Sequence, residues 1–434
     1  MNTKSPNPPH VPTVLRSYFR MLPQKLITEM IIEKTSNKGL DITETEAAMV
    51  AELFVSKNEH NDVDAYYSGR IDVLVKMGLV DSRQAFLDEM ESRARNFLEL
   101  FPQQLETLQI KTANELLEFA ECSWPQTSKE IVSERQRFRS DLYKTWSEPF
   151  EKFRMLREMC FDFGSDYVKG LRQRPPVERE SLREVMVVAH SRACQIADEI
   201  LYLMEGGYAD GALALSRSLH ELAVISMFIS THGEETARRF LAHRFVDLKR
   251  DERHYQDFLE QRGEQVGEWR DNPVFLKFQE VIGEFGIGFE RDYGWADDVF
   301  EGDRRITFYD IEKNIFEDNE TNNMRYFYRL ANRSIHVRPV NLYSRAGIPV
   351  EKPLLLAGPS DIGFLDPGRW AAVSLAMVTV SLFSVGEPSA DELLGETDFR
   401  FAVSFSVVMR CLENTIASFD ATQESLDRSA AQEG

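Results

Sequence analysis

The sequence predicts a mainly α-helical protein, a multi-helix bundle with a helical N-terminal region. Apolar residues recur three and four positions apart over long stretches, as they do on one face of a helix. Glycines interrupt these stretches at helix-like intervals, and no alternation of polar and apolar residues is long enough for a substantial sheet. The 434 residues, 43% of them hydrophobic, are enough for two or three domains with buried cores.

The N-terminal part is expected to begin with a disordered tail, residues 1–12, which contains four prolines and no apolar segment of the kind a secretion signal needs. Residues 13–171 follow as the helical N-terminal region. Within it, Thr43 and Glu46 have the spacing of a capping box and predict a helix start. Pro149 predicts an interruption of a later helix, because proline lacks the backbone N–H that a helix interior uses.

A linker is predicted at residues 172–181, where two prolines stand among dense charge. The C-terminal domain, residues 182–420, follows it. Glycines divide the beginning of this domain into three helices, 182–204, 208–230 and 234–259. Because the connections are short, we expect these helices to pack as neighbours.

The rest of the C-terminal domain is less regular in sequence. Residues 263–304 are rich in glycine and acidic residues and predict an irregular acidic insertion, which would serve as a lid or as a partner-binding loop. Further helices are expected at 318–335, 369–385 and 397–419, and residues 421–434 form a polar tail. The uncharged stretch within the second of these helices carries several hydroxyl side chains, so we expect a buried core helix and no membrane association.

Composition limits the classes of function. The 51 basic and 71 acidic residues give a formal net charge of −20, which argues against a protein that coats nucleic acid broadly. The four cysteines form no CxxC pair and predict buried free thiols in a cytoplasmic protein. No HExxH motif or phosphate-binding loop is present, so no metal and no cofactor is expected.

One segment departs from the acidic balance. Residues 321–350 contain no acidic residue and five arginines: Arg325, Arg329, Arg333, Arg338 and Arg345. On a helix, the first three of these share a face with His336, and such stacked like charges repel unless an anion lies between them. That anion is either a carboxylate of the same protein or a phosphate ligand. Tyr328 lies among these residues and would stack on a base or pack in the core.

A second polar group interrupts the apolar segment 211–230, which contains Arg217, His220 and Glu221. A charge buried in an apolar helix must be paired, and Arg217 and Glu221 are four residues apart and therefore able to pair. The segment thus predicts either an internal ion pair between helices or a polar pocket among them.

Two segments carry a family resemblance. HSRACQIADEILYLMEGGYADGALALSRSLHELAVI, residues 190–225, followed later by RLANRSIHV, resembles bacterial proteins of unassigned function whose helical core is similar to HEPN (higher eukaryote and prokaryote nucleotide-binding) domains. Many HEPN domains are metal-independent ribonucleases with an Arg, four to six residues and then a His. Arg329 and His336 match that motif with six residues between them. The resemblance covers about residues 182–420.

The resemblance implies an endoribonuclease that acts on RNA such as tRNA, with the role of a toxin or an anti-phage defence effector. In this interpretation His336 is the acid or base, since the ordinary pKa of an imidazole, about 6.5, suits either role. Arg329 holds the scissile phosphate. Substrate-binding residues would be Arg325, Arg333, Arg338 and Tyr328, and supporting residues Arg217, His220 and Glu221. A homodimer and a protein activator or inhibitor are further expectations. The alternative is an inactive helical module that binds RNA, a nucleotide or a protein, or that serves as a scaffold.

Overall fold

The computed structural model describes ten stretches of the chain: 11–55, 63–173, 179–264, 272–302, 304–316, 318–335, 339, 346–348, 357–385 and 396–433. In these stretches all regular structure is helical and no strand occurs, so the predicted mainly α fold is confirmed. The chain divides into two compact units, residues 1–134 and 135–434. Residues 1–10 of the predicted tail lie outside the described residues. The first helix begins at Val11.

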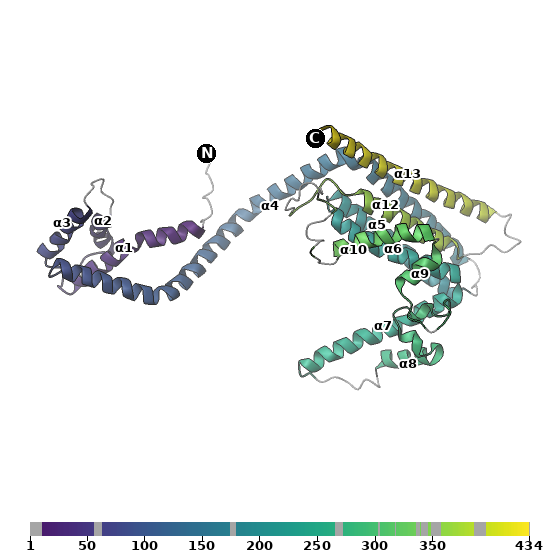
Figure 1. Ribbon diagram of the computed structural model, residues 1–434, viewed down its shortest axis with the longest axis horizontal. Helices are drawn as coiled ribbons and strands as arrows, with labels where there is room; N and C mark the ends of the chain where they lie inside the picture. The colour runs from purple at the N-terminus through teal and green to yellow at the C-terminus, as the bar shows by residue number, and fades with distance from the viewer. Residues whose placement is uncertain are drawn as a thin grey trace. The chain divides into compact units, whose positions relative to one another are not determined.

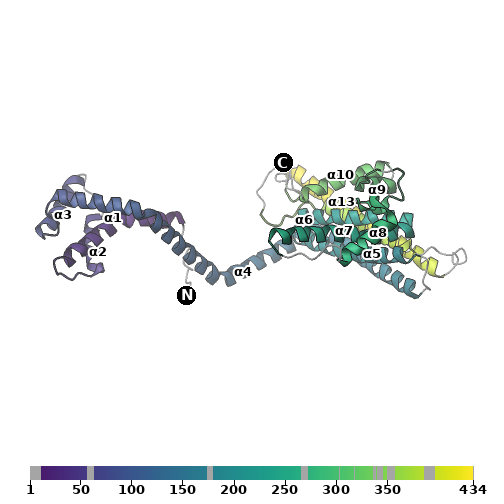
Figure 2. The same cartoon turned by 90° about the horizontal axis from the view of Figure 1, so that it is seen from below.

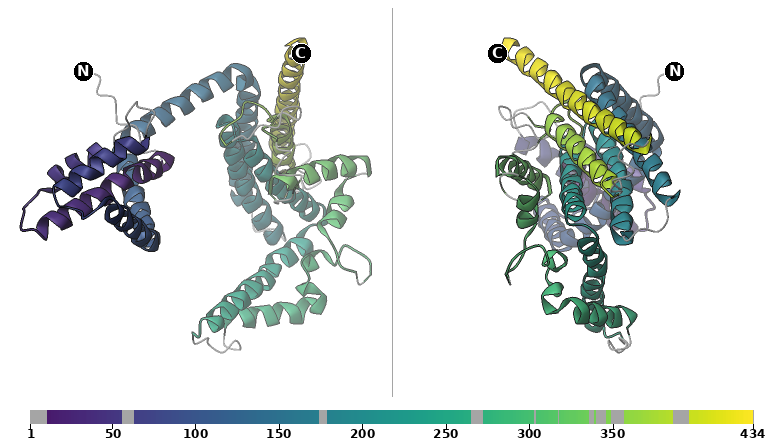
Figure 3. Two further views of the ribbon diagram at one scale, coloured as in Figure 1. Left: turned by 60° about the vertical axis from the view of Figure 1, so that its left-hand side comes forward. Right: turned by 90° about the vertical axis from the view of Figure 1, so that its right-hand side faces the viewer.

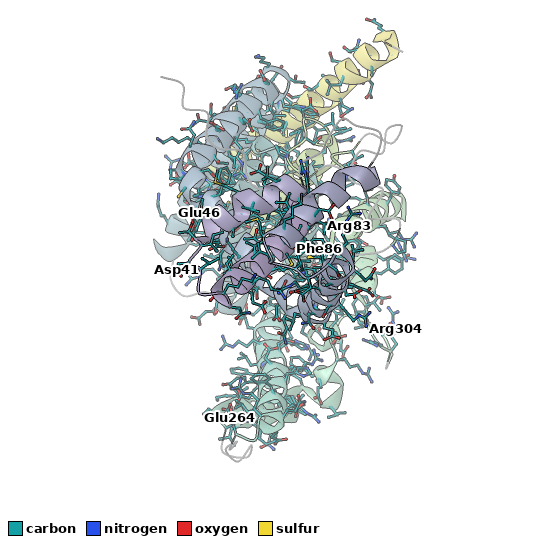
Figure 4. The ribbon with its side chains drawn as sticks, turned by 90° about the vertical axis from the view of Figure 1, so that its left-hand side faces the viewer. Asp41, Glu46, Arg83, Phe86, Glu264 and Arg304 are labelled. Carbon is teal, nitrogen blue, oxygen red and sulfur yellow. The ribbon has the colours of Figure 1, made fainter. Side chains whose placement is uncertain are left out.

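The first unit is built from α1 (Val11–Ser36), α2 (Glu44–Val55), α3 (Val63–Lys76) and the beginning of α4 (Arg83–Gln173). Their apolar faces share one core, in which Met30 and Leu74 are fully buried and Phe86 nearly so. The predicted capping box is confirmed: Thr43 N donates to Glu46 Oε2 at 2.9 Å, and Glu46 N donates to Thr43 Oγ1 at 3.3 Å. Glu46 and Phe86 are labelled in Figure 4.

Helix α4 is continuous over 91 residues, so the interruption expected at Pro149 is wrong. A proline inside a helix costs about 3 kcal/mol. Three aromatic side chains on the same stretch, Trp146, Phe150 and Phe153, are fully buried in the core of the second unit. Each stabilises the fold by roughly 1.5–3 kcal/mol, which together outweighs the cost of the proline.

The compact units divide inside α4, whereas the sequence predicted a division at residues 172–181. The C-terminal part of α4 belongs to the second unit because its aromatic side chains lie in that unit's core. α4 ends at Gln173 and α5 (Glu180–Glu205) begins at Glu180, so the Pro-Pro segment falls between these two helices. A helix that continues through the division has no proline- or glycine-rich sequence to mark it.

The second unit has a bundle of α5, α6 (Ala209–His232), α12 (Leu365–Phe383) and α13 (Glu396–Glu433), with α7 (Glu234–Gln261) following α6. α12 packs against α5, α6 and α13, and Figure 3 shows α13 alongside it. The three helices predicted from 182 to 259 are confirmed to within a few residues. Gly207 and Gly233, with φ of 84° and 85°, end α5 and begin α7 in a backbone conformation that favours glycine.

The bundle tests the predictions of a buried core helix and of a polar C-terminal tail. α12 is a buried core helix, as expected. Among the described residues, α6 alone has the length and hydropathy of a membrane-spanning helix, and most of its apolar side chains are buried in the bundle. α13 continues to Glu433, so residues 421–433 of the predicted polar tail are helical. There Leu426 packs against the core, and Arg428 lies one turn after Glu424, which supports the helix.

The acidic insertion predicted at 263–304 is only partly irregular in its described residues. It contains α8 (Pro273–Phe285) and the short 3-10 helices η2 (Ile287–Glu290) and η3 (Gly294–Ala296). α8 lies against α7 (Figure 1), and Phe289 and Trp295 are buried in the shared core. The acidic side chains pair with cations of α7: Lys249 Nζ lies 2.6 Å from a carboxylate oxygen of Glu290. The insertion's acidity therefore serves local packing.

The cysteines are free thiols, but one of them differs from the prediction. Cys160, Cys194 and Cys411 are buried, and Cys122 is exposed on α4. Burial raises the pKa of the Cys160 thiol to about 12 and that of Cys194 to about 11. These two thiols are therefore protonated and unreactive at neutral pH.

Candidate functional site

The candidate site is built around α10 (Asp318–Ile335), the helix predicted at 318–335. Phe327 and Ala331, one turn apart, are fully buried against Leu213 of α6. The ring of Phe327 stacks on Trp370 of α12, with centroids 4.4 Å apart and planes at 23°. One face of α10 is thereby fixed to the bundle, next to α9 (Phe308–Ile315), as Figures 1 and 2 show.

Arginines occupy another side of α10. Arg329 is exposed, and no hydrogen bond or ion pair joins it to any residue in the part of the chain that the structure describes. Arg325 is half-buried, and its guanidinium lies 4.1 Å from the ring centroid of Tyr309 on α9. Neither arginine is paired with a described carboxylate. The described carboxylates therefore do not neutralise this part of the basic segment.

Tyr328 joins α10 to α6 through a closed hydrogen-bonded group. Arg217 Nη2 lies 2.8 Å from Glu221 Oε1 and donates to the Tyr328 hydroxyl at 2.7 Å, and that hydroxyl donates to Glu221 Oε1 at 2.8 Å. The Arg217 guanidinium also lies 4.7 Å from the centroid of the Tyr328 ring. The pairing of Arg217 with Glu221 is confirmed. The hydroxyl of Tyr328, a residue predicted to bind substrate, holds two helices together.

His220 lies beside this group and is fully buried. Its Nε2 is 2.9 Å from Glu312 Oε1, and Glu312 is itself 2% exposed. The His220 ring meets Phe327 edge to face at 6.0 Å, so the imidazole packs directly against α10. His220 Nδ1 is buried and has no hydrogen-bond partner among the described residues.

Glu312 is the residue that sequence reasoning missed. It lies on α9, 92 positions after His220, so no local spacing connects the two. A signal was present: Glu312 follows Phe308 by four and precedes Ile315 by three, which places a carboxylate on the apolar face of a short helix. A carboxylate in that position requires a buried partner.

Tyr293 belongs to the segment predicted as an acidic insertion and lies next to the site. Burial raises the pKa of its phenol, and the nearby carboxylate of Glu221 raises it further. Tyr293 lies between η2 and η3, so the segment expected to be a lid or a partner-binding loop contributes a residue close to Glu221 of α6. Burial likewise raises the pKa of the Tyr328 phenol. Both tyrosines are therefore neutral hydrogen-bonding groups at physiological pH.

The remaining predicted residues are not placed. His336 and Arg338 lie outside the described residues, and so does the side chain of Arg333. The structure thus brings together Arg217, His220, Glu221 and Tyr328, with Arg325 and Arg329 on the same α10. Within the described stretches, no three His, Cys, Asp or Glu side chains gather in a group that could hold a metal ion.

Comparison with known proteins places the site within a matching segment. Residues 183–350 match the model of a family of unknown function, DUF5677. No curated protein and no solved structure matches the chain. The matched segment is less than half of the chain, and it runs from α5 through α10. Every described residue of the candidate site therefore lies in the part of the chain that is similar to this family.

Proposed function

We propose that the chain is a metal-independent endoribonuclease of HEPN type, and that the exposed side of α10 binds the RNA. The observation that carries the proposal is the state of Arg329. It is exposed and unpaired among the described residues, in a chain whose formal net charge is −20. With so many carboxylates in the chain, an arginine that pairs with none of the described ones is placed to take an external anion such as a phosphodiester.

The support beneath α10 fits that role. A phosphate-binding arginine acts best from a rigid element, because the bound geometry is then already present before the ligand arrives. α10 is held to α12 through Phe327 and Trp370, and to α6 through Tyr328 and its two partners. Arg325 is also held in place, over the ring of Tyr309.

The proposed chemistry needs no metal. The ribose 2′-oxygen attacks the adjacent phosphorus, the bond from phosphorus to the 5′-oxygen breaks, and a 2′,3′-cyclic phosphate forms. His336 takes the proton from the 2′-hydroxyl or donates one to the departing 5′-oxygen. Arg329 donates two hydrogen bonds to the phosphate and stabilises the extra negative charge of the transition state.

The wider proposal follows from the Arg–His spacing and the helical core. RNA, including tRNA, is the proposed substrate, a homodimer the proposed assembly and the cytoplasm the proposed location. A toxin or antiviral defence role, controlled by a protein activator or inhibitor, belongs to the same proposal.

The test is an RNA cleavage assay with the purified full-length chain. Total cellular RNA and tRNA are incubated with it in EDTA, and the fragment ends are examined. Cyclic phosphate ends that disappear in His336→Ala and Arg329→Ala, but persist in Arg305→Ala, support the proposal. Arg305 is a matched control because it is an exposed arginine already paired with Asp292. Intact RNA under all conditions, or cleavage that survives His336→Ala, overturns it.

A second candidate, an inactive RNA-binding module, is favoured by one residue. HEPN nucleases commonly carry a polar residue directly after the motif arginine, whereas this chain has Leu330. That side chain packs against the buried group formed by Phe327, Ala331 and Leu213. The same assay separates the two functions, because the module binds RNA through Arg325, Arg329 and Arg333 and leaves it uncut.

A further inference from the structure

A groove of about 730 Å³ runs between α4 and α13 in the second unit. Its lining comes from residues 144–152 of α4 and residues 414–426 of α13. The two helices touch beside it, where Thr415 Oγ1 donates to the carbonyl oxygen of Lys152 at 3.1 Å. Small side chains of α13 leave the space open: Ala417, Ala421 and Ser425. We call this hollow the α4–α13 groove.

Two charged side chains of the groove have no partner among the described residues. Lys152 is half-buried, and no ion pair or hydrogen bond joins its ammonium group to the described part of the chain. The same is true of the carboxylate of Glu148, one turn earlier on α4. At the edge of the groove, in contrast, the Lys144 ammonium lies 2.6 Å from Asp141. The groove thus offers a free cation and a free carboxylate, which accepts hydrogen bonds from hydroxyl groups.

Ser418 of α13 supplies a third unsatisfied group. It lines the groove and is 8% exposed, and its Oγ is buried without a hydrogen-bond partner among the described residues. Thr415, on the same helix, instead donates to Cys411 O at 2.7 Å, which is a common way for a helix hydroxyl to be satisfied. A buried hydroxyl without a partner keeps the cost of its desolvation. A ligand that forms a hydrogen bond with Ser418 removes that cost.

We propose that the α4–α13 groove binds a sugar phosphate. The phosphate accepts hydrogen bonds from the Lys152 ammonium, and the sugar hydroxyls pair with Glu148 and Ser418. The exposed amide of Asn414, which also lines the groove, is a further partner for a hydroxyl. A ligand with one anionic group and several neighbouring hydroxyls uses all of these side chains.

Other classes of small molecule fit the lining less well. None of the described residues that line the groove is aromatic, so the base of a nucleotide would have no ring on which to stack. Polar side chains predominate in the lining, which disfavours a purely apolar ligand. The volume of the groove lies within the range of about 300–1,000 Å³ that is typical of small-molecule sites.

The proposed site is separate from the proposed RNA site. α10 packs against α6, α9 and α12, and none of its residues lines the groove. Sugar phosphate binding can therefore be measured whether or not the chain cuts RNA.

Titration calorimetry of the full-length chain tests the proposal. The probes are glucose 1-phosphate, glucose 6-phosphate and ribose 5-phosphate, with glucose and inorganic phosphate for comparison. At least one sugar phosphate is expected to bind about tenfold more tightly than glucose or phosphate does. Phosphate that binds as tightly as every sugar phosphate, or no binding of any sugar phosphate, overturns the proposal. Binding only to vesicles that contain phosphatidylinositol phosphate would assign the groove to a lipid head group and would also overturn it.

A lysine variant tests the place of binding. Lys152→Gln removes the charge that holds the phosphate and is expected to weaken binding about tenfold. Lys169→Gln is the matched control, because Lys169 is an exposed lysine of the same helix, lies outside the groove and is 2.9 Å from Asp166. An affinity that Lys152→Gln leaves unchanged, or that both variants lower equally, contradicts binding in the groove.

A serine variant separates a role in binding from a role in the fold. Ser418→Ala should leave the Tm of the free chain unchanged or raise it, because the hydroxyl has no described partner to lose, and should weaken sugar phosphate binding about fivefold. Ser374→Ala is the control, since the Ser374 hydroxyl on α12 is also buried without a described partner but lies outside the groove. If Ser418→Ala lowers the Tm and leaves the affinity unchanged, the hydroxyl serves the fold and does not contact the ligand.

Discussion

His220 Nε2 lies 2.9 Å from Glu312 Oε1, and the two side chains are buried together between α6 and α9. The same two helices are joined a second time near the surface, where His232 Nε2 lies 2.8 Å from Asn314 Oδ1. The chain thus contains a buried and an exposed histidine contact across one helix pair. Burial decides how much each contact contributes to the free energy of unfolding. A buried polar group that loses its partner keeps the full cost of its desolvation.

We therefore predict that Glu312→Leu lowers the free energy of unfolding by about 3 kcal/mol, since it leaves the His220 ring buried without its partner. Glu312→Gln keeps a hydrogen-bond acceptor and should lose less. Asn314→Ala, the exposed control, should change stability by less than about 0.5 kcal/mol. Urea unfolding of the full-length variants measures all three, and equal effects for Glu312→Leu and Asn314→Ala would show that burial does not govern this contact.

The hydroxyl of Tyr328 should matter for stability and little for RNA affinity. Tyr328→Phe removes its bonds to Arg217 and Glu221 and is expected to lower the free energy of unfolding by about 2 kcal/mol. Arg329→Ala should have the opposite profile, with stability unchanged and RNA binding weakened. Urea unfolding and RNA-binding titrations measure the two properties. A larger loss of affinity in Tyr328→Phe than in Arg329→Ala would return Tyr328 to the role of a substrate-binding residue.

Salt dependence gives a separate test of Arg329. An arginine that contacts one phosphate of single-stranded RNA contributes about 0.7 to the slope of log affinity against log salt concentration. Arg329→Ala should reduce the slope by that amount, and Arg305→Ala, whose guanidinium is paired with Asp292, should leave it unchanged. Identical slopes for the native chain and Arg329→Ala would exclude a direct phosphate contact.

Because the ring of His190 is buried, we predict that the chain loses stability in acid. It is buried between α4 and α5, and burial lowers the pKa of its ring from 6.5 to about 4. Between these two values the unfolded chain binds a proton that the folded chain does not, so unfolding becomes easier as the pH falls. At pH 5 this amounts to about 2 kcal/mol relative to pH 7. The measurement is unfolding at both pH values, and His190→Gln should show a smaller difference than the native chain does.

The spacing of residues close together in the sequence explains which features were predicted correctly. The helices from 182 to 259 were recognised because regular apolar spacing ends at glycines, and Gly207 and Gly233 do adopt positive φ there. The pairing of Arg217 with Glu221 was predictable because both lie on one helix, one turn apart. In each case the interacting groups are close in sequence, so spacing alone determines the geometry.

Contacts between residues far apart in the sequence explain which features were not predicted. Tyr328 completes the Arg217 group from 107 positions beyond Glu221, and no spacing rule covers such a separation. α8 was hidden because glycines and acidic residues gave the segment the composition of a loop, whereas its stability comes from packing against α7. Pro149 was misread for the same reason, since the burial of Trp146 and Phe150 is a tertiary effect.

Gly164 on α4 gives the last prediction, because it makes room for His190. A Cβ at this position would lie 2.2 Å from Cε1 and 2.7 Å from Nε2 of the His190 ring. The ring cannot easily retreat, since it is buried and its Nε2 contacts Cys194 Sγ at 3.8 Å. Gly164→Ala should therefore destabilise the chain by about 2 kcal/mol, even though alanine favours a helix.

Gly170 is the control on the same helix, because a Cβ there meets no atom of the described residues within 4 Å. Gly170→Ala should stabilise the chain by about 1 kcal/mol through helix propensity alone. The His190→Ala background then isolates the clash: once the ring is removed, Gly164→Ala should become neutral or stabilising, as in a double-mutant cycle between contacting residues. If Gly164→Ala destabilises the chain equally with and without the ring, the close approach of Gly164 to His190 does not explain why this position is glycine.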